Sequence, residues 1–279
     1  MTDCLDGKNL CLTVGQCGVV KLIDVMPRIL PSYAKSADYA IVEAARVSYG
    51  PGTEKVNDDI SLIRYLMRHN HTSPFEMCEV KFYFKLPIFV ARQMVRHRTA
   101  SINESSARYS EMIDDFFVPA EPIRAQSSSN RQGSEGVVEC TTDDAFRDYV
   151  DANNSIAYDT YRDFLSKGVS RELARIIMPL TTCTSWYWKI DLHNLFHFLE
   201  LRLDAHAQEE IRVYAQAIFN IVKEIFPVSC KAFEEYRLGS VTLSALELKA
   251  LKTDQPLASE NRRECLEWDH KKKHYFSHD

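Results

Sequence analysis

Two hydrophobic patterns divide the chain. The runs NLCLTV and GVVKLIDV flank residues 15–18, Gly-Gln-Cys-Gly, and predict a β-hairpin, while VKFYFK at 80–85 predicts a further strand. Apolar residues three and four positions apart predict helices over 36–48, 59–69, 88–97, 146–165, 171–178, 192–225, 229–237 and 244–252. Early strands followed by many helices predict an α+β fold, with a small mixed or antiparallel sheet packed with long helices and a helix-rich C-terminal half.

Polar segments set the expected domain limits. Residues 125–142, AQSSSNRQGSEGVVECTT, are rich in Ser and Gly and predict a mobile loop rather than a domain linker. We expect one α+β domain over residues 1–240 and a C-terminal helical extension with a charged tail over 241–279. The end of this tail, DHKKKHYFSHD, predicts a solvated, poorly ordered terminus.

Composition narrows the functional classes. A net charge of −5 provides no chain-wide basic surface for nucleic acid, so a bound anion must meet a local cluster of cations. The eight cysteines lack a CxxC spacing, which favours reduced, structural thiols over a disulfide framework or a zinc site. The sequence shows neither a signal-peptide pattern nor a stretch of about eighteen apolar residues, so we expect a cytoplasmic protein.

The RHR triplet at 96–98, with Arg108 close behind, is open to two interpretations. Basic residues at the C-terminal end of a helix interact favourably with its macrodipole. Ser101 and Glu104 have the spacing of a capping box, so the cluster can have a purely structural role. The apolar segment IFVARQMV, directly before the triplet, instead predicts a buried helix. Guanidinium groups at the end of a buried helix need partners of opposite charge. Glu104 is the one carboxylate nearby, which implies an external anion such as a phosphate.

Two more arginines interrupt apolar sequence: Arg175 in LARIIMP and Arg202 in LELRLDAHAQ. Each can be a partly exposed or ion-paired residue, or the arginines can converge from separate segments on a nucleotide phosphate. The glycine-rich phosphate-binding motifs G-x-G-x-x-G and G-x-x-x-x-G-K-[ST] are missing, so side chains would have to replace them.

These stretches resemble one known family. RHRTASINESSARYS at 96–110 is similar to the signature of the flavin-dependent thymidylate synthases, an RHR triplet followed by a serine, here Ser106. Further blocks carry the same resemblance: LIDVMPR at 22–28, AARVSYG at 44–50, HTSPFE at 71–76, PIFVARQMVRHR at 87–98, LARIIMPL at 173–180 and NLFHFLELRLDAHAQEEIR at 194–212. It covers most of the chain, but neither the 125–142 loop nor the residues after 240.

The resemblance implies an enzyme of de novo dTMP biosynthesis. It would methylate dUMP to dTMP with 5,10-methylenetetrahydrofolate as carbon donor, FAD as redox carrier and NADPH as reductant. It also implies a homotetramer with shared active sites and makes 1–240 the catalytic domain. No cysteine lies in a motif that would attack uracil, so the flavin is expected to replace a protein cysteine nucleophile.

The resemblance also implies roles for single residues. Expected FAD contacts are Ser48, His71, Ser73, Arg96, His97, Arg98, Asn103, Glu104, Asp191, His193 and His197. Expected dUMP ligands are Gln93, Glu104, Ser106, Ala107, Arg108, Arg175 and Arg202, with catalytic roles for Arg202, Ser106 and His71. Arg108 and Arg175 can neutralise the phosphate, while Arg202 can bond the uracil edge and stabilise charge that develops on the ring.

Ser106 could be a ligand or a nucleophile. A serine nucleophile needs an adjacent base and a group that orients this base. His97 is the one imidazole nearby in sequence and has no evident orienting group, so we expect Ser106 to bind substrate.

The segment DLHNLFH departs from the family, whose members often have Asn or Arg where this chain has Asp191, His193 and His197. His193 and His197 lie one helical turn apart and can face the flavin together, or they can be partly buried histidines bonded to neighbours. With Glu200 they also form an H-x-x-x-H-x-x-E pattern that could ligate a metal, although a matching carboxylate-rich helix is missing. A nucleic-acid-binding module, with the basic stretch clamping phosphates, is disfavoured by the acidic total charge.

Overall fold

The computed structural model describes residues 2–5, 10–49, 58–120, 122–128, 132–138 and 140–276. The chain divides into two compact units, Met1–Leu238 and Gly239–Asp279. The first unit holds the sheets and every residue expected at the site. The assignment of residues 1–240 as the catalytic domain stays a prediction.

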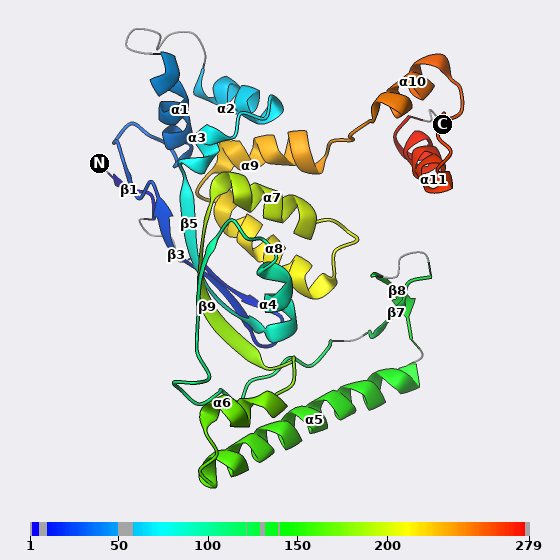
Figure 1. The fold of residues 1–279 in the computed structure, drawn as a ribbon. Coiled ribbons are helices and arrows are strands. Elements are labelled where there is room, and N and C mark those ends of the chain that lie inside the picture. The colour runs from blue at the N-terminus through cyan, green and yellow to red at the C-terminus, as the bar shows by residue number, and fades with distance from the viewer. Residues whose placement is uncertain are drawn as a thin grey trace. The chain divides into compact units, whose positions relative to one another are not determined.

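A five-stranded antiparallel sheet in the order β2-β3-β5-β9-β6 forms the centre of the first unit (Figure 1). Its strands are β2 Cys11–Val14, β3 Gly18–Met26, β5 Glu79–Pro87, β9 Cys183–Asp191 and β6 Ser101–Glu104. The predicted hairpin is confirmed as β2 and β3, and the strand at 80–85 as β5. Two short pairs stand apart, β1 Thr2–Asp3 with β4 Ile29–Leu30 and β7 Arg124–Gln126 with β8 Ser134–Val137.

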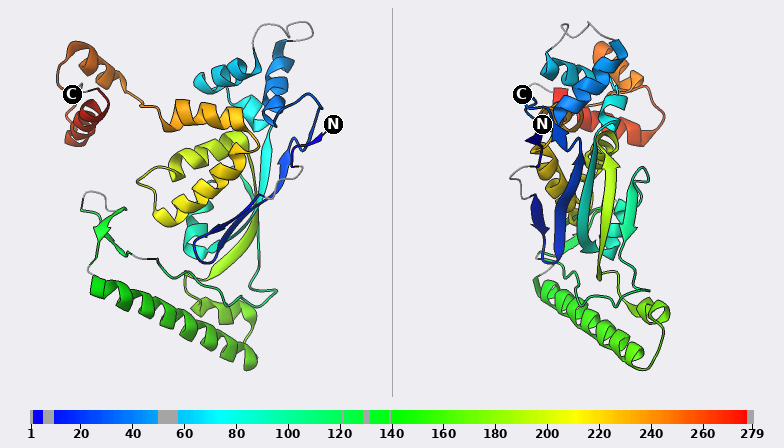
Figure 2. Two further views of the ribbon diagram at one scale, coloured as in Figure 1. Left: turned by 180° about the vertical axis from the view of Figure 1, so that it is seen from behind. Right: turned by 90° about the vertical axis from the view of Figure 1, so that its left-hand side faces the viewer.

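Large apolar side chains at alternate positions of β5 and β9 point to one face of the sheet and form the core. Phe82 and Phe84 of β5 face Trp188 and Trp186 of β9 in the register of the sheet, and all four side chains are buried. Helices α4 Ile88–Met94, α7 Leu192–Arg202 and α8 Glu209–Lys223 cover this side of the sheet (Figure 2). Burial of such aromatic surface, at roughly 25 cal/mol per Å², is the main stabilising contribution to this layer.

Further helices complete the first unit: α1 Asp38–Arg46, α2 Asp59–Arg68, α3 Ser73–Glu76, α5 Cys140–Ser166, α6 Arg171–Ala174 and α9 Pro227–Phe233. Asp38 ties α1 to α9, because its carboxylate accepts hydrogen bonds from the backbone of Val228 and Ser229, both at 2.9 Å. Burial is the main reason that the pKa of Asp38 is raised, although these hydrogen bonds oppose the shift.

The second unit contains α10 Ala245–Thr253 and α11 Arg262–Lys271. The capping box expected at the start of α10 is present: Ser244 accepts from the backbone of Glu247, and the Glu247 carboxylate accepts from the backbone of Ser244. The poorly ordered end expected for 269–279 is wrong for residues 269–276, which form the end of α11 and a π-helical turn, while 277–279 lie outside the described residues.

Three other expectations are corrected. The helix predicted over 192–225 is interrupted at residues 203–208, where Asp204 accepts from the backbone of His206 at 2.7 Å in a local turn. Ser101 and Glu104 do not cap a helix, because both lie in strand β6. The expected loop 125–142 contains β8, most of β7 and the start of α5, while residues 129–131 and 139 lie outside the described residues.

Candidate active site

A cavity of about 580 Å³ opens beside the edge strand β6, and we name it the sheet-edge cavity. Four residues expected to bind dUMP line it: Glu104, Ser106, Ala107 and Arg175. Its wall also includes the first three residues of β9, 183–185. The volume lies within the roughly 300–1,000 Å³ that is usual for small-molecule sites.

Sheet pairing explains why these residues meet. Strand β6 runs antiparallel to β9 with Glu104 opposite Trp186, and the backbone N–H of Ser105 donates to the Ser185 carbonyl at 2.8 Å. Thr184 donates from Oγ1 to Glu104 Oε1 at 2.6 Å. Arg175 reaches the same cavity from the 3₁₀ turn that follows α6. Two strands and a helix end therefore position a carboxylate, a hydroxyl and a guanidinium around one space.

Ser106 lies on the wall of the sheet-edge cavity. Its Oγ accepts a hydrogen bond from the backbone N–H of Arg108 at 3.3 Å. No histidine is among the described residues that line this cavity, so the usual imidazole base of a serine nucleophile is missing from its walls. The Arg108 side chain is exposed, with its Nε 3.8 Å from Glu172 Oε2.

A second cavity, of about 190 Å³, is the histidine cavity. His71, His193 and His197, all expected at the flavin, line it together. The remaining lining residues are Leu66, Met67, Asn70, Thr72, Phe75, Phe196, Glu200, Phe233 and Arg237. Phe196 and Phe233 stack with their ring centroids 4.6 Å apart. The cavity therefore combines a flat apolar wall with imidazole groups that can donate or accept.

Arg202 and His97 form a hydrogen-bonded pair beside His197 of the histidine cavity. Arg202 donates from Nε to His97 Nε2 at 3.1 Å, and the ring centroids of His97 and His197 are 6.1 Å apart. Burial, the Arg202 charge and His197 lower the pKa of His97 to about 4, so this imidazole is neutral at pH 7. Burial also lowers the pKa of Arg202, although arginine stays charged at this pH.

The other expected residues are more dispersed. Gln93 of α4 donates to the side-chain oxygen of Gln208, and Asp191 caps α7 by accepting from the backbone and side chain of Asn194 at 2.9 and 2.8 Å. The remaining ones are exposed: Ser48, Ser73, Arg96, Arg98 and Asn103. These five line neither cavity within the described part of the chain.

Two ideas about charge are corrected. Arg96 and Arg98 follow a helix with a buried apolar face, but both side chains are exposed and pay no large desolvation cost in a single chain. Within one chain the five arginines do not meet at one point, since Arg175 lines the sheet-edge cavity while Arg202 bonds His97. The end of α4 thus directs Arg96 and Arg98 toward solvent, while His97 between them turns inward to Arg202.

The metal interpretation of His193, His197 and Glu200 is not supported. All three residues line the histidine cavity, but their ligand atoms do not gather at a metal-binding distance. Throughout the described residues, the one group of three with that geometry is Cys17, Asp115 and Cys183.

Residues of strand β9 were missed by sequence reasoning. Thr184 and Cys183 line the sheet-edge cavity, yet no motif marks them. The alternating run SWYWKI is typical of a strand, but its pairing with β6, which gives Glu104 its neighbours, has no sequence signal. Arg237 and Asn70, which bond each other beside the histidines, carry no sequence signal that we recognise.

None of the helices in the described part of the chain combines the length and the apolar character needed to cross a membrane.

Comparisons with known proteins match most of the first unit. The family described as thymidylate synthase complementing protein matches residues 29–228. A flavin-dependent thymidylate synthase of Dictyostelium discoideum is 54% identical over 260 residues, covering 93% of this chain and 85% of that protein. One from Thermus thermophilus is 52% identical over 235 residues, covering 84% of this chain and 82% of that protein.

A solved structure has the same fold. The UMP/dUMP methylase PolB of Streptomyces cacaoi, bound with 5-Br UMP, superposes with a TM-score of 0.69 and 30% sequence identity. The match covers 79% of this chain and 95% of the methylase. The α+β prediction is confirmed by this agreement and by the sheet itself.

Proposed function

This chain belongs to the flavin-dependent thymidylate synthases, and we propose that it converts dUMP to dTMP with FAD as redox carrier, 5,10-methylenetetrahydrofolate as carbon donor and NADPH as reductant. The membership rests on a family match over residues 29–228 and on relatives above 50% identity. The structural observation that carries the proposal is the sheet-edge cavity, where four expected dUMP ligands line one space of nucleotide size.

The sheet-edge cavity suits a nucleoside monophosphate. Arg175 supplies a fixed positive charge with a planar donor fork that suits a phosphate. Glu104, held in place by Thr184, and Ser106 offer acceptors and a hydroxyl for the sugar or the base. The cavity thus combines a cationic donor with a carboxylate and a hydroxyl, a set of groups that suits the phosphate, sugar and base of a nucleotide.

Cys183 lies on the wall of this cavity, but its thiol is not activated for attack on a uracil ring. Its S–H donates to Cys17 Sγ at 3.0 Å, and this hydrogen bond together with burial raises the pKa of the Cys183 thiol well above its usual range. The nucleophile of cysteine chemistry is the thiolate, which is scarce here at neutral pH. This supports a reaction without a protein cysteine nucleophile.

The histidine cavity fits part of a flavin by the chemistry of its groups. The stacked Phe196 and Phe233 provide an apolar wall, and His71, His193 and His197 provide donors or acceptors. FAD, when bound, would carry electrons from NADPH to the reductive methylation. A space of about 190 Å³ holds only a portion of a dinucleotide, so the rest must lie against other surfaces, and the exposed Arg96 and Arg98 suit its phosphates.

Arg202 and His97 are suited to a pyrimidine whose negative charge increases during the reaction. His97 accepts from Arg202 Nε, which orients the guanidinium and leaves its terminal nitrogens for other acceptors. A positioned cation of this kind stabilises charge that develops on the uracil ring. The neutral His97 holds Arg202 without adding a second charge.

A homotetramer with shared sites is part of the proposal. Arg202 bonds His97 beside the histidine cavity, whereas Arg175 and Ser106 line the sheet-edge cavity. If one dUMP contacts all of them, the groups come from more than one chain. Sedimentation velocity with and without ligands measures this, and a monomer that is active at all concentrations would exclude shared sites.

The test of function is direct. Purified protein with FAD, NADPH and methylenetetrahydrofolate should convert dUMP to dTMP, measured by chromatography of the nucleotides, and should lose this activity when FAD is withheld. UMP should be run beside dUMP, because the structural neighbour is described as a UMP/dUMP methylase. Production of 5-methyl-UMP at a rate equal to that of dTMP would argue for a broader methylase.

A further inference from the structure

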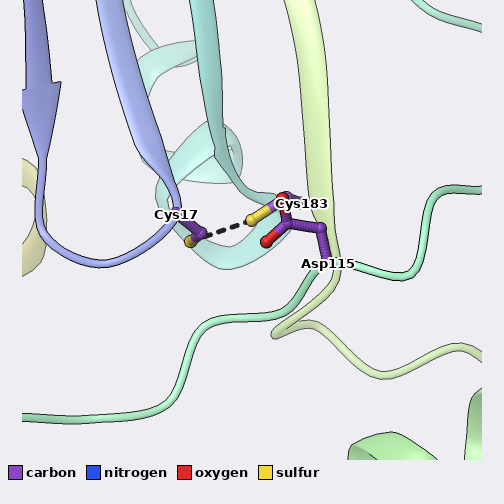
Figure 3. A group of neighbouring side chains, drawn as sticks. All are labelled: Cys17, Asp115 and Cys183. Carbon is purple, nitrogen blue, oxygen red and sulfur yellow. Dashed lines mark hydrogen bonds between the residues drawn. The ribbon is translucent and has the colours of Figure 1, made fainter.

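Two cysteines that are 166 positions apart in sequence meet at one end of the sheet (Figure 3). Cys17 lies in the turn between β2 and β3, and Cys183 is the first residue of β9. Both β3 and β9 run antiparallel to β5, so the start of each strand lies at the same end of the sheet. Their Sγ atoms are 3.0 Å apart, with Cys183 donating.

The turn that carries Cys17 is held in place by close packing. A Cβ added at Gly18 would lie 2.1 Å from the Tyr214 hydroxyl oxygen and 2.4 Å from the Val14 carbonyl oxygen, so only glycine fits here. The Tyr214 hydroxyl donates to the Lys85 carbonyl at 3.1 Å, which ties α8 to the sheet beside the thiols. The two sulfurs are therefore positioned by the fold and not by a flexible loop.

The neighbouring charges distinguish the two thiols. Lys85 forms an ion pair with Asp115, and the Asp115 carbonyl accepts from the Cys183 N–H at 2.8 Å. The hydrogen bond from Cys183 lowers the pKa of Cys17, and Lys85 acts in the same direction, while burial and Asp115 oppose them. Cys17 is half-buried and lines a separate cavity of about 240 Å³, whereas Cys183 is buried. Cys17 is thus the thiol suited to attack, and Cys183 the one suited to resolve.

We propose that Cys17 and Cys183 form a redox-active dithiol that a peroxide oxidises to an intramolecular disulfide. The Cys17 thiolate attacks one peroxide oxygen, the O–O bond breaks, and the departing oxygen takes a proton and leaves as water or an alcohol. Cys17 is then a sulfenic acid. The Cys183 thiol then attacks the Cys17 sulfur while its proton passes to the departing hydroxyl group, which leaves as water. Two thiols have lost two electrons and two protons, and the peroxide has gained them.

The spacing favours a disulfide over a metal site. The three candidate ligand atoms of Cys17, Asp115 and Cys183 lie within 4.8 Å of one another. In a tetrahedral zinc site with Zn–S bonds of about 2.3 Å, two sulfurs would be about 3.8 Å apart, which is wider than the 3.0 Å seen here. A disulfide needs about 2.05 Å, so the sulfurs must approach by about 1 Å. Asp115 is moreover already paired with Lys85.

Oxidation of the two cysteines should weaken dUMP binding in the sheet-edge cavity. This consequence rests on the proposed function. Cys183 lines that cavity, and its neighbour Thr184 donates to Glu104. Movement of Cys183 toward Cys17 alters the position of Thr184 and so of the Glu104 carboxylate. We expect the Kd for dUMP to rise about two- to tenfold in the oxidised protein, the size of one weakened hydrogen bond.

The experiment is a thiol map of the reduced full-length protein. After treatment with hydrogen peroxide, free thiols are blocked with N-ethylmaleimide and the peptides are analysed by mass spectrometry. We expect a Cys17–Cys183 cross-linked peptide, a loss of two reactive thiols and recovery of both with dithiothreitol. C183S should leave Cys17 as a sulfenic acid that dimedone traps, C17S should give no cross-link, and C11S, at an exposed cysteine of β2, should behave as wild type.

Experiments on wild-type protein distinguish the dithiol from a metal site, so the test does not depend on whether a variant folds. Wild-type protein in which Cys17 and Cys183 both remain alkylatable after peroxide, while Cys11 is oxidised, overturns the dithiol. Stoichiometric zinc that blocks alkylation until a chelator removes it overturns the dithiol in favour of a metal site. A cross-link that forms without any change in dUMP affinity supports the dithiol and refutes its coupling to the nucleotide. Absence of dUMP binding in the reduced protein bears on the proposed function alone.

Discussion

The sheet-edge cavity and the histidine cavity differ in how much of a binding site one chain provides. Paired strands form the first, so the carboxylate of Glu104 is held by Thr184 from the adjacent strand, and its volume is about 580 Å³. Helix faces and a loop form the second, and its volume is about 190 Å³. Strand pairing positions polar groups through backbone hydrogen bonds, whereas helices placed by apolar contacts leave their polar side chains at the rim. We therefore expect a single chain to provide a larger part of the nucleotide site than of the flavin site.

The largest effect should come from a residue on which both cavities depend. Trp188 is fully buried in β9, the strand that begins beside the sheet-edge cavity and leads into α7 with its histidines. Trp188→Ala should lower the free energy of unfolding by about 3–5 kcal/mol, measured by urea denaturation, because the void cannot be refilled. Tyr187→Ala, at a 44% exposed neighbour on the other face, is the control and should cost about 1 kcal/mol or less. Equal losses in the two variants would contradict this view of the core.

Arg175→Ala should affect the sheet-edge cavity alone. We expect the Kd for dUMP, measured by calorimetry, to rise about 10- to 100-fold, the usual value of a hydrogen bond to a charged group. FAD retention should not change, because Arg175 does not line the histidine cavity. Arg171→Ala, at an exposed arginine of α6, is the matched control and should bind dUMP as wild type does. Equal loss in both variants would mean that net charge rather than position is responsible.

His193→Ala should weaken the flavin site more modestly. Since a neutral hydrogen bond contributes about 1 kcal/mol, we expect the Kd for FAD to rise about three- to tenfold, measured by flavin fluorescence. His270→Ala, at an exposed histidine of the second unit, is the control. Unchanged FAD affinity in His193→Ala, together with weaker dUMP binding, would exchange the roles of the two cavities.

The smallest effect concerns pH. The pKa of His97 is about 4 in the folded chain and 6.5 in its ordinary state, so the unfolded chain binds more protons between these values. The free energy of unfolding should therefore rise with pH across this window, and His97 should lose its contribution as the pH falls through it. His97→Asn should flatten this slope, while the exposed His206→Asn should not. An NMR titration that gives His97 a pKa near 6.5 would refute the neutral imidazole.

Sequence reasoning predicted the hairpin β2–β3, the helices α1 and α2, strand β5 and the capping box at Ser244, because each depends on neighbours in the chain. It failed at the break between α7 and α8, where the turn at Asp204 interrupts an apolar stripe that continues on both sides. The exposure of Arg96 and Arg98 was also missed, since an apolar helix does not reveal where its last turn points.

The sequence by itself determined the family, because the RHR signature and its companion blocks are local patterns of residue types, and it determined which polar residues are available for chemistry. Only the tertiary structure decided how those residues divide between two cavities. It alone placed Thr184 against Glu104, Arg202 against His97 and Cys17 against Cys183, which are 80, 105 and 166 positions apart in the chain. The physical reason is that contacts over such separations are set by strand order and by the packing of the core, and neither is encoded in any short segment.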